Sequence, residues 1–250
     1  MTQETLEMLK KLKLLGMSRA YQMSLENNTL VHLSADELLK MLVESEWDDR
    51  LNRNIERRIK EAKFRYQSSV ESINFEADRN LDRNQLMRFA ECSFIKKQEN
   101  ILITGSTGIG KSHLATAIGH QACISGFKVY YANMAKLFTK LKMGKADGSY
   151  AREIARIDRH DLLILDDFGL LPMDNQNRSA LMEIIEDRHN KGSMIITSQL
   201  PVNCWHEVIG EKTIADAILD RIVHDAHRIE LRGESLRKSK NKQRETGSLN

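Results

Sequence analysis

ILITGSTGIGKSHLATAIG, residues 101–119, is the stretch that decides the fold. An apolar run leads into a break in which glycine alternates with small polar residues, and a lysine and a serine then open a helix-forming segment. Glycine adopts backbone conformations that are closed to other residues and lets the chain approach a ligand closely. The stretch therefore predicts a strand, a ligand-binding loop and a helix in direct succession.

The loop in this stretch, GSTGIGKS, matches the pattern G-x-x-x-x-G-K-[ST] of a phosphate-binding loop. Successive backbone N–H groups of such a loop point at phosphate oxygens, and the following helix presents its positive end to them. We expect Lys111 to reach the β- and γ-phosphates of ATP and the Ser112 hydroxyl to ligate Mg²⁺. A chance match in a chain of this length has a probability of roughly one per cent. The residues predicted to hold the nucleotide are Gly105, Ser106, Thr107, Gly108, Ile109, Gly110, Lys111 and Ser112.

A second motif, LLILDD at residues 162–167, has the pattern of a buried strand that ends in two carboxylates. The alternative is a strand that merely stops at acidic turn residues, but the phosphate loop upstream favours a catalytic pair. We expect Asp166 to hold the metal ion through a water molecule. Asp167 is predicted to orient or polarise the water that attacks the γ-phosphate.

Further apolar runs of strand length alternate with segments of helix length. This alternation predicts a parallel sheet that is covered by helices on both faces. The run at 194–198 ends in polar residues, and if it lies between the two motif strands, Gln199 or Ser198 will sit beside the γ-phosphate. The five predicted strands are 101–104, 128–132, 162–166, 194–198 and 228–231.

The N-terminal part of the chain has helical spacing of its apolar residues. Gly16 is expected to end a first helix, and Ser34 with Glu37 forms a capping-box pattern that opens a helix continuing past Arg50. Trp47 is expected to anchor packing, as is Trp205 in the later part of the chain. We predict three regions, namely a helical N-terminal domain over 1–75, the nucleotide-binding domain over 76–240, and a basic flexible tail over 241–250.

Residues 50–66, RLNRNIERRIKEAKFRY, form a basic segment with seven Arg or Lys against two Glu. Apolar residues recur on one helix face, and charged residues gather on another. Such a run is commonly a solvated surface. Repeated Arg and Lys on one face can also neutralise a nucleic-acid backbone. The face in question carries Arg50, Arg53, Arg57 and Lys60.

Composition excludes several classes of protein. The formal charge is +3, and the three cysteines lack the paired spacing of a disulfide framework or a zinc site. Charges interrupt every apolar run well short of the 18 residues of a membrane span, and the charged N-terminus does not resemble a signal peptide. We therefore expect a cytoplasmic protein with no membrane partner.

Five motifs occur in a fixed order that resembles the AAA+ ATPases, and within them the branch of the transposition helper IstB and the helicase loader DnaC. The resemblance covers about residues 75–240, and the N-terminal segment LKLLGMSRAYQ extends it. The last three motifs are weak alone, and the ordered set is specific. The motifs are GSTGIGKSHLA, LLILDDFGL, IITSQ, ILDRI and GESLR.

The resemblance implies a fold and a set of site residues. The fold is α/β, a P-loop AAA+ ATPase core with a five-stranded parallel sheet in the order 5-1-4-3-2, preceded by a small all-helical N-terminal domain. Gln199 corresponds to the first sensor, Arg221 to the arginine finger supplied to a neighbouring subunit, and Arg237 to the second sensor. His113 follows the loop in the same way as in the family, so it joins the predicted nucleotide-binding residues.

The resemblance also implies partners. An IstB-like helper is an ATPase that oligomerises on double-stranded DNA, with ATP at the subunit interfaces, and recruits or stimulates an integrase-type transposase in the bacterial cytoplasm. This implication favours DNA contact for the basic helix face. Two alternatives remain, a DnaC-like replicative helicase loader and a small-molecule kinase that uses the same phosphate loop.

One departure from the wider family concerns Asp167, where most AAA+ ATPases carry Glu. The shorter side chain would hold the attacking water less well, and a positioning error of about 1 Å can cost on the order of 100-fold in rate. We therefore expect slow hydrolysis, or hydrolysis that depends on stimulation by DNA or a partner.

Overall fold

The computed structural model describes residues 2–75 and 79–236 of the chain. The predicted tail 241–250 and the predicted second sensor Arg237 lie outside the described residues. By internal contacts the chain divides into two compact units, Met1–Arg57 and Arg58–Asn250.

The first unit is helical, as predicted. Its elements are α1 (Thr2–Lys11), α2 (Leu15–Glu26), the short 3-10 helix η1 (Thr29–His32) and α3 (Ala35–Ala62), which continues into the second unit. The capping box is confirmed at the start of α3. The backbone N–H of Glu37 donates to the Ser34 hydroxyl at 3.3 Å, and the Glu37 carboxylate accepts from the Ser34 N–H at 2.8 Å.

Gly16 has a different role from the one predicted, because it lies in the first turn of α2 and does not end a helix. The chain leaves α1 through Lys13, which has a positive φ of 59°. A Cβ at Gly16 would stand 2.3 Å from the Ser45 carbonyl oxygen of α3, so only glycine allows this close crossing of two helices. The buried Glu46 carboxylate accepts from the Gly16 N–H at 2.8 Å and fixes the crossing.

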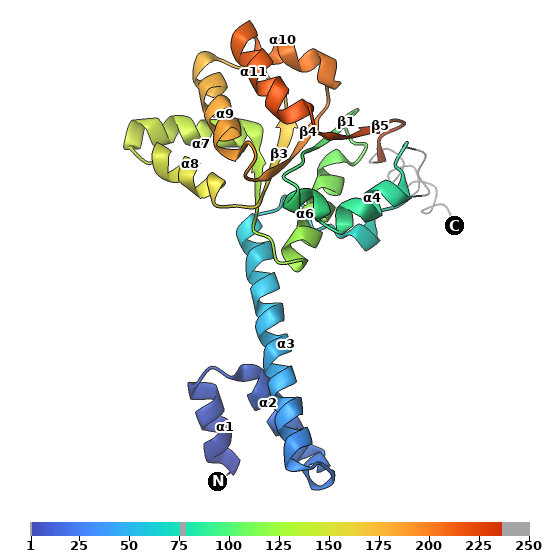
Figure 1. Cartoon of the computed structure of the whole chain (residues 1–250), viewed down its shortest axis with the longest axis vertical. Coiled ribbons are helices and arrows are strands. Elements are labelled where there is room, and N and C mark those ends of the chain that lie inside the picture. The colour runs from blue at the N-terminus through green and yellow to red at the C-terminus, as the bar shows by residue number, and fades with distance from the viewer. Residues whose placement is uncertain (1, 76–78, 237–250) are drawn as a thin grey trace, which may run out of the picture. The chain divides into compact units, whose positions relative to one another are not determined.

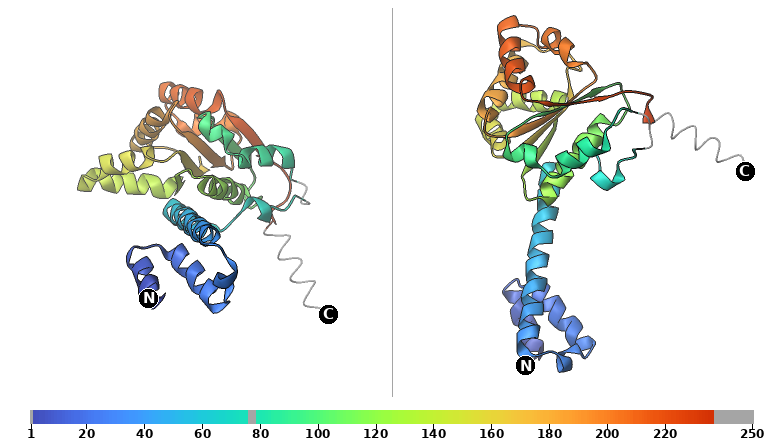
Figure 2. Two further views of the ribbon diagram at one scale, coloured as in Figure 1. Left: turned by 60° about the horizontal axis from the view of Figure 1, so that its bottom comes forward. Right: turned by 45° about the vertical axis from the view of Figure 1, so that its right-hand side comes forward.

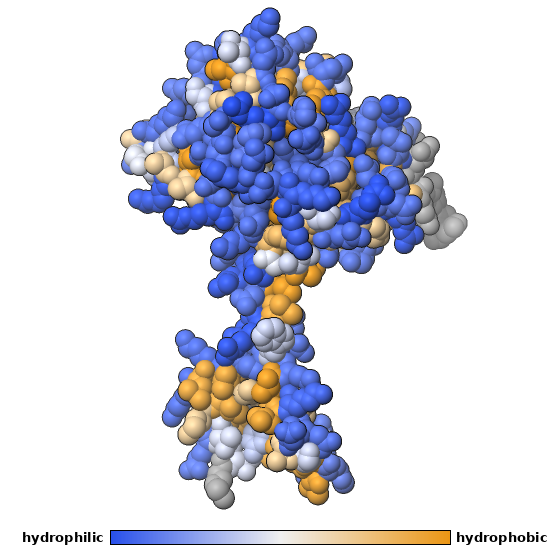
Figure 3. Space-filling view, viewed as in Figure 1, coloured by the Kyte–Doolittle hydropathy of each residue, from blue (hydrophilic) through white to orange (hydrophobic). Residues whose placement is uncertain are grey.

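Apolar side chains gather on the surface of the first unit, as the orange areas of Figure 3 show over its helices. Trp47 is 70% exposed, so the prediction that it anchors packing is wrong. Trp205, in the second unit, is fully buried and stacks on Phe168 at 4.3 Å between ring centroids, as predicted. The exposed apolar residues of α3 are Leu39, Val43, Trp47 and Leu51.

The second unit is built on a five-stranded parallel sheet in the order β2-β3-β4-β1-β5 (Figure 1). Read from the other edge, this is the predicted order 5-1-4-3-2. Because all strands run in parallel, their carboxyl ends meet at one edge of the sheet. The strands are β1 (Ile101–Gly105), β2 (Val129–Asn133), β3 (Leu162–Phe168), β4 (Ser193–Ser198) and β5 (His227–Leu231).

Helices cover both faces of the sheet (Figure 2). Alternate residues of each strand point to opposite faces, so Ile101 and Ile103 of β1 enter one core cluster and Leu102 enters the other. The helices of this unit are α4 (Arg83–Ala90), α5 (Ser93–Lys96), α6 (Lys111–Ile124), α7 (Met134–Asp147), α8 (Tyr150–Asp158), α9 (Asn175–Arg188), α10 (Trp205–Ile209) and α11 (Lys212–Val223), with the 3-10 helices η2 (Val70–Ser72) and η3 (Val202–Cys204).

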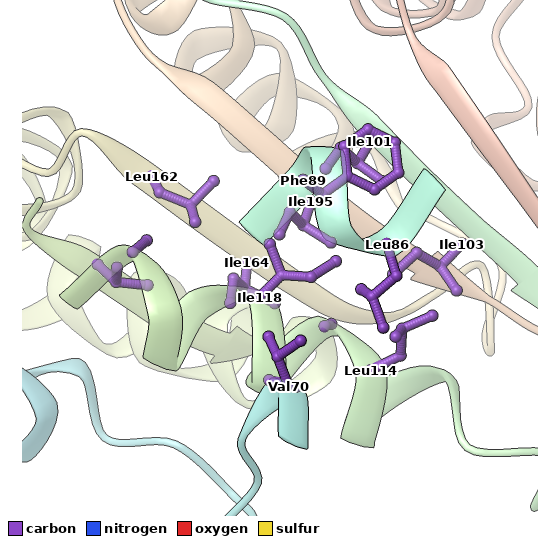
Figure 4. Packing of buried hydrophobic residues seen from close by; sticks show 14 of the residues in the cluster. Val70, Leu86, Phe89, Ile101, Ile103, Leu114, Ile118, Leu162, Ile164 and Ile195 are labelled. Atoms are coloured by element: carbon purple, nitrogen blue, oxygen red, sulfur yellow. The ribbon is translucent and has the colours of Figure 1, made fainter. Parts of the chain in front are cut away.

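The segment after α3 packs with the nucleotide-binding unit. Ala62, Val70 and Ile73 are buried in the core cluster that α4 and α6 form against the sheet, and Figure 4 shows Val70 beside Leu114 and Ile118 of α6. Because this segment packs into the second unit, the boundary between the two units lies between Arg57 and Arg58, inside α3. The chain between α3 and β1 is thus brought to the same face of the sheet as the helix that follows the phosphate loop.

Candidate nucleotide-binding site

The phosphate loop joins β1 to α6 at the carboxyl edge of the sheet. Its three glycines, Gly105, Gly108 and Gly110, have positive φ angles of 147°, 81° and 104°. These angles are unfavourable for residues with a Cβ. Lys111 and Ser112 form the first turn of α6, whose N–H groups lack intrahelical partners and face the loop.

Close packing explains why glycine occupies these three positions. A Cβ would stand 2.4 Å from the Leu231 carbonyl at Gly105, 2.2 Å from the Ser235 hydroxyl at Gly108 and 2.8 Å from the Arg79 guanidinium at Gly110. The loop is also fastened from behind, where the Leu236 N–H donates to the Gly108 carbonyl at 3.1 Å. The conformation of the loop is therefore fixed by segments that precede β1 and that end or follow β5 in the sequence.

Lys111 is the cation of the loop and is only 6% exposed. Its ammonium group donates to the carbonyls of Gly105 at 2.8 Å and Ser106 at 2.9 Å. Burial lowers the pKa of Lys111, and the charges of Asp167 and Asp166 act in the opposite direction. An anion bound in the loop would favour the charged ammonium group in the same way.

Asp166 is completely buried at the end of β3. Its carboxylate accepts a hydrogen bond from the Tyr131 hydroxyl and another from the Thr197 hydroxyl, the latter at 2.6 Å. Burial, then the hydrogen bond to Asp166, raises the pKa of Tyr131 and keeps that hydroxyl protonated as a donor. The two donors, which come from β2 and β4 on either side of β3, fix the position of this carboxylate.

Asp167 has a positive φ of 63°, and its N–H donates to the Thr197 hydroxyl at 3.1 Å. The Oδ2 atom of Asp167 accepts from the Asn133 amide at 2.9 Å and from the Arg65 guanidinium at 3.4 Å. Burial, then the neighbouring charge of Asp166, raises the pKa of Asp167, and Arg65 and Lys111 oppose the rise. One oxygen of the predicted catalytic carboxylate therefore already contacts an arginine.

Gln199 follows β4, and β4 lies between the two motif strands as predicted. The Thr107 hydroxyl of the phosphate loop donates to the Gln199 side-chain oxygen at 2.6 Å. This contact brings the predicted first sensor directly to the loop that is expected to hold the phosphates.

Arg221 lies far from the loop of its own chain. Its carbonyl accepts from the side chain of Asn100, which directly precedes β1 and therefore lies at the amino edge of the sheet. Its guanidinium forms an ion pair with Glu186 of α9 at 2.8 Å. Because the phosphate loop lies at the opposite edge, Arg221 is separated from the predicted nucleotide site of its own chain.

His113 contacts the segment before the ATPase core. Its Nδ1 atom lies 2.9 Å from the Ser68 hydroxyl, and its ring lies 6.3 Å from the ring of Tyr66. The histidine therefore fastens residues 66–68 to α6, which gives a structural reason for its place after the loop. Its predicted contact with the nucleotide has no further support in this geometry.

Two arginines of the site escaped sequence reasoning. Arg79 stands in a polar stretch that has the composition of a linker, yet it is buried and donates to the carbonyls of Ile109 at 3.3 Å and Asn74 at 2.7 Å. Arg65 has the pattern of one more charge in the basic segment, yet it reaches the carboxylates of β3. The contacts of Arg79 with Ile109 and of Arg65 with Asp167 have no local sequence signal, because each joins residues far apart in the chain.

The four residues predicted to contact DNA all lie on α3, and two of them already have acidic partners. Arg50 pairs with Glu46 at 2.7 Å, and Arg53 pairs with Asp49 at 2.6 Å. Arg57 donates to the neutral side chain of Asn54 at 3.2 Å, and Lys60 is exposed. Arg57 and Lys60 therefore have the greater share of charge available for a phosphate backbone.

Comparison with known proteins assigns the family. The family described as IstB-like ATP binding protein matches residues 7–244. This chain belongs to the IstB-like ATP-binding family. The predicted resemblance is thereby confirmed.

Relatives of this IstB-like chain carry descriptions that refer to insertion sequences. The protein y4pL of Sinorhizobium fredii, described as an insertion sequence ATP-binding protein, is 45% identical over 235 residues, which is 94% of this chain and 96% of the relative. The ATP-binding protein of insertion sequence IS21 from Pseudomonas aeruginosa is 31% identical and covers 92% of this chain and 87% of its own length.

Solved structures confirm the AAA+ fold of this IstB-like chain. DnaI superimposes with a TM-score of 0.58 at 24% identity, over 66% of this chain and 92% of that one. AMPPCP-bound DnaA from Aquifex aeolicus has a TM-score of 0.58 at 18% identity, over 72% of this chain and 56% of that one.

Within the part of the chain that the structure describes, no helix is long and apolar enough to cross a bilayer.

Proposed function

We propose that this IstB-like protein is an ATP-dependent, DNA-binding transposition helper. It oligomerises on double-stranded DNA and recruits or stimulates an integrase-type transposase at the target. The observation that carries the proposal is the division of the predicted site between the two edges of the sheet. Lys111, Asp167 and Gln199 gather at one edge and Arg221 lies at the other, so a complete site needs a second copy of the chain.

Within this proposal each side chain has a defined task in ATP hydrolysis. The amide groups of the loop and the ammonium group of Lys111 bind the triphosphate and neutralise the charge that develops on it. Asp167 accepts or polarises the proton of the attacking water. Gln199 orients groups at the γ-phosphate, and Arg221 of a neighbouring copy stabilises the transition state.

The oxygen donors at the site fit Mg²⁺, which prefers hard oxygen ligands and keeps several of its waters. Ser112 in the first turn of α6 and the oriented carboxylate of Asp166 are the residues that would hold it. When bound, the ion would supply positive charge that neutralises the phosphate oxygens.

The shared site predicts a result for mixed subunits. Arg221→Ala should lower the ATPase rate on the order of a thousandfold, because an arginine finger contributes a factor of about 10³ or more. An equimolar mixture of Arg221→Ala with Asp167→Asn subunits should regain activity, since each Asp167→Asn subunit supplies its intact Arg221 to a neighbour. The measurement is phosphate release by each variant alone and by the mixture.

Loss of the Glu186 ion pair is the main complication for Arg221→Ala, so Glu186→Ala serves as the matched control for folding of the α9–α11 contact. Glu186→Ala should keep most of the activity. If the mixture stays as inactive as its two components while both variants fold, the finger does not act between subunits.

DNA binding is tested by duplex affinity in the presence of a non-hydrolysable ATP analogue. Arg57→Ala with Lys60→Ala should weaken binding to all sequences alike and reduce the slope of log affinity against log salt by about 2, because each phosphate contact contributes about 0.9. The matched control is Lys10→Ala with Lys11→Ala, which removes the same charge from exposed residues of α1 that are not predicted to contact DNA. An unchanged slope would assign this face of α3 to solvent.

The relatives' descriptions, which refer to insertion sequences, favour a helper over a helicase loader. The similarity to DnaI and DnaC is below 25% identity and supports the fold alone. A direct comparison is binding of the ATP-bound protein to the transposase of its own element and to the replicative helicase of its host. Binding to the helicase alone would replace the helper by the loader.

A further inference from the structure

A basic cavity lies beside Asp167 in the nucleotide-binding unit, with a volume of about 420 Å³. Four cationic side chains and one carboxylate line it, so the charged groups of its wall sum to +3 (four less one). The cations are Lys63, Arg65, Lys136 and Lys140, and the carboxylate is that of Asp167. A cavity with this excess of positive charge suits an anion.

The cations come from two separate elements. Lys63 and Arg65 belong to the chain that leaves α3, and Lys136 and Lys140 lie one turn apart on α7. Residues at this spacing share one helix face, with their Cβ atoms about 5–6 Å apart. Lys140 is paired with Glu153, whereas Lys63 and Lys136 are exposed. The rim can therefore contact more than one phosphate of an extended ligand.

The aromatic residues of the cavity are unsuited to stacking on a base or nucleoside. Tyr130 and Tyr131 are each 7% exposed. The ring of Tyr130 lies beneath the Arg156 guanidinium at 5.3 Å, and the Tyr131 hydroxyl donates to Asp166. Sequence-independent binding of single strands relies on exposed aromatic faces on which successive bases stack. A duplex presents only its phosphates to such a wall, and it is the ligand that the cavity fits.

Arg65 connects this cavity to the catalytic carboxylates. Its NH1 atom lies 3.4 Å from Asp167 Oδ2 and 3.7 Å from Asp166 Oδ2. The Arg65 side chain is 48% exposed, so its guanidinium can be reached from the cavity. A phosphate group in the cavity can therefore compete with Asp167 for the guanidinium.

The geometry points to a second phosphate site for the DNA backbone, formed by Lys63, Arg65, Lys136 and Lys140, in which a bound phosphate draws Arg65 away from Asp167. The site couples DNA binding to hydrolysis, because Asp167 then loses its cationic partner and keeps only the neutral Asn133 amide on its Oδ2 atom, which leaves the carboxylate freer to act on water. This inference rests on the proposed function, since it names the DNA contact that stimulates the same ATPase.

The test measures phosphate release by the full-length protein with and without duplex DNA. Lys63→Ala with Lys136→Ala should reduce the ratio of stimulated to basal rate about fivefold to tenfold, through loss of two phosphate contacts. Lys128→Ala with Lys191→Ala is the matched control, because it removes the same charge at the opposite, amino edge of the sheet. The control should keep the ratio of the unaltered protein.

A second variant tests the arginine itself. Arg65→Ala should raise the basal rate toward the DNA-stimulated rate and leave little further stimulation, whereas Arg65→Lys should restore part of the dependence on DNA. The inference is overturned if the cavity variant is stimulated as strongly as the control, or if Arg65→Ala leaves the basal rate unchanged or lower.

Two other outcomes have distinct meanings. If the unaltered protein neither binds duplex DNA nor responds to it, the proposed function fails, and the cavity assignment fails with it. If the rate rises with protein concentration alone, and Lys63→Ala with Lys136→Ala abolishes that rise, the occupant is an acidic group of a neighbouring copy. That result overturns the assignment to DNA and leaves the rest of the proposed function standing.

Discussion

Lys111→Ala should strongly reduce the affinity for ATP. The ammonium group is buried at the base of the phosphate loop, where it donates to the Gly105 carbonyl, and in the proposed function it donates to phosphate oxygens. A hydrogen bond to a charged group contributes about 1.5–3 kcal/mol, so loss of two such bonds should weaken affinity on the order of a hundredfold or more. The measurement is calorimetric titration of ATP and Mg²⁺ into the folded variant.

The matched control for Lys111→Ala is Lys128→Ala, which removes an exposed lysine at the opposite edge of the sheet. Thermal unfolding of both variants separates loss of binding from loss of fold, because Lys111 also holds the carbonyls of Gly105 and Ser106. Retention of the original affinity in a folded Lys111→Ala protein would mean that the triphosphate does not occupy this loop.

Asp167→Asn should lower the hydrolysis rate on the order of 100- to 10,000-fold, the usual contribution of a general base, and leave ATP binding within a few-fold. The amide keeps the size of the side chain and can still contact Asn133, but it cannot accept a proton from water. Single-turnover phosphate release and equilibrium binding of ATP measure the two effects separately.

Asp167→Glu is the informative companion variant. The carboxylate is retained one methylene further out, so this variant should hydrolyse ATP at least as fast as the natural chain and far faster than Asp167→Asn. A rate for Asp167→Asn equal to that of the unaltered protein would remove Asp167 from the mechanism. A loss in Asp167→Glu as large as in Asp167→Asn would show that the cavity beside β3 is shaped for the shorter acid.

The contacts of Asp167 give a physical basis for the predicted slow hydrolysis, in addition to its short side chain. Its Oδ2 atom is engaged by Asn133 and Arg65 on the side of β2. The same carboxylate must turn to a water molecule at the γ-phosphate during catalysis. A protein that first has to release its base is suited to act as a switch that responds to a partner.

Much of the ATPase core could be predicted from the sequence, because its signals are local. The glycines of the loop, the apolar run before it and the helix after it are neighbours in the chain, and steric and hydrogen-bonding rules act over a few residues. The five strands were predicted to within two residues at each end, since buried parallel strands leave continuous apolar runs. The capping box at Ser34 could be predicted for the same reason, because its two residues are only three positions apart.

Other features depend on contacts between distant segments and had no local signal. Gly16 has the pattern of a helix stop, but the close approach of α3 is what requires it. Tryptophan is a residue type that is usually buried, yet Trp47 remains largely exposed on α3. Arg79 stands in a segment typical of a linker and is buried against the phosphate loop by the fold.

The sequence by itself determined that this chain has a phosphate loop, two acidic residues at the end of a buried strand, and helices that pack on a parallel sheet. Only the tertiary structure decided that Thr107 contacts Gln199 and that Arg65 donates to the Asp167 carboxylate. It also decided that Arg221 lies at the amino edge of the sheet, away from the phosphate loop of its own chain. The reason is physical. Backbone conformation follows from neighbours in the chain, whereas the partner of a charged side chain depends on which segments the folded core brings together.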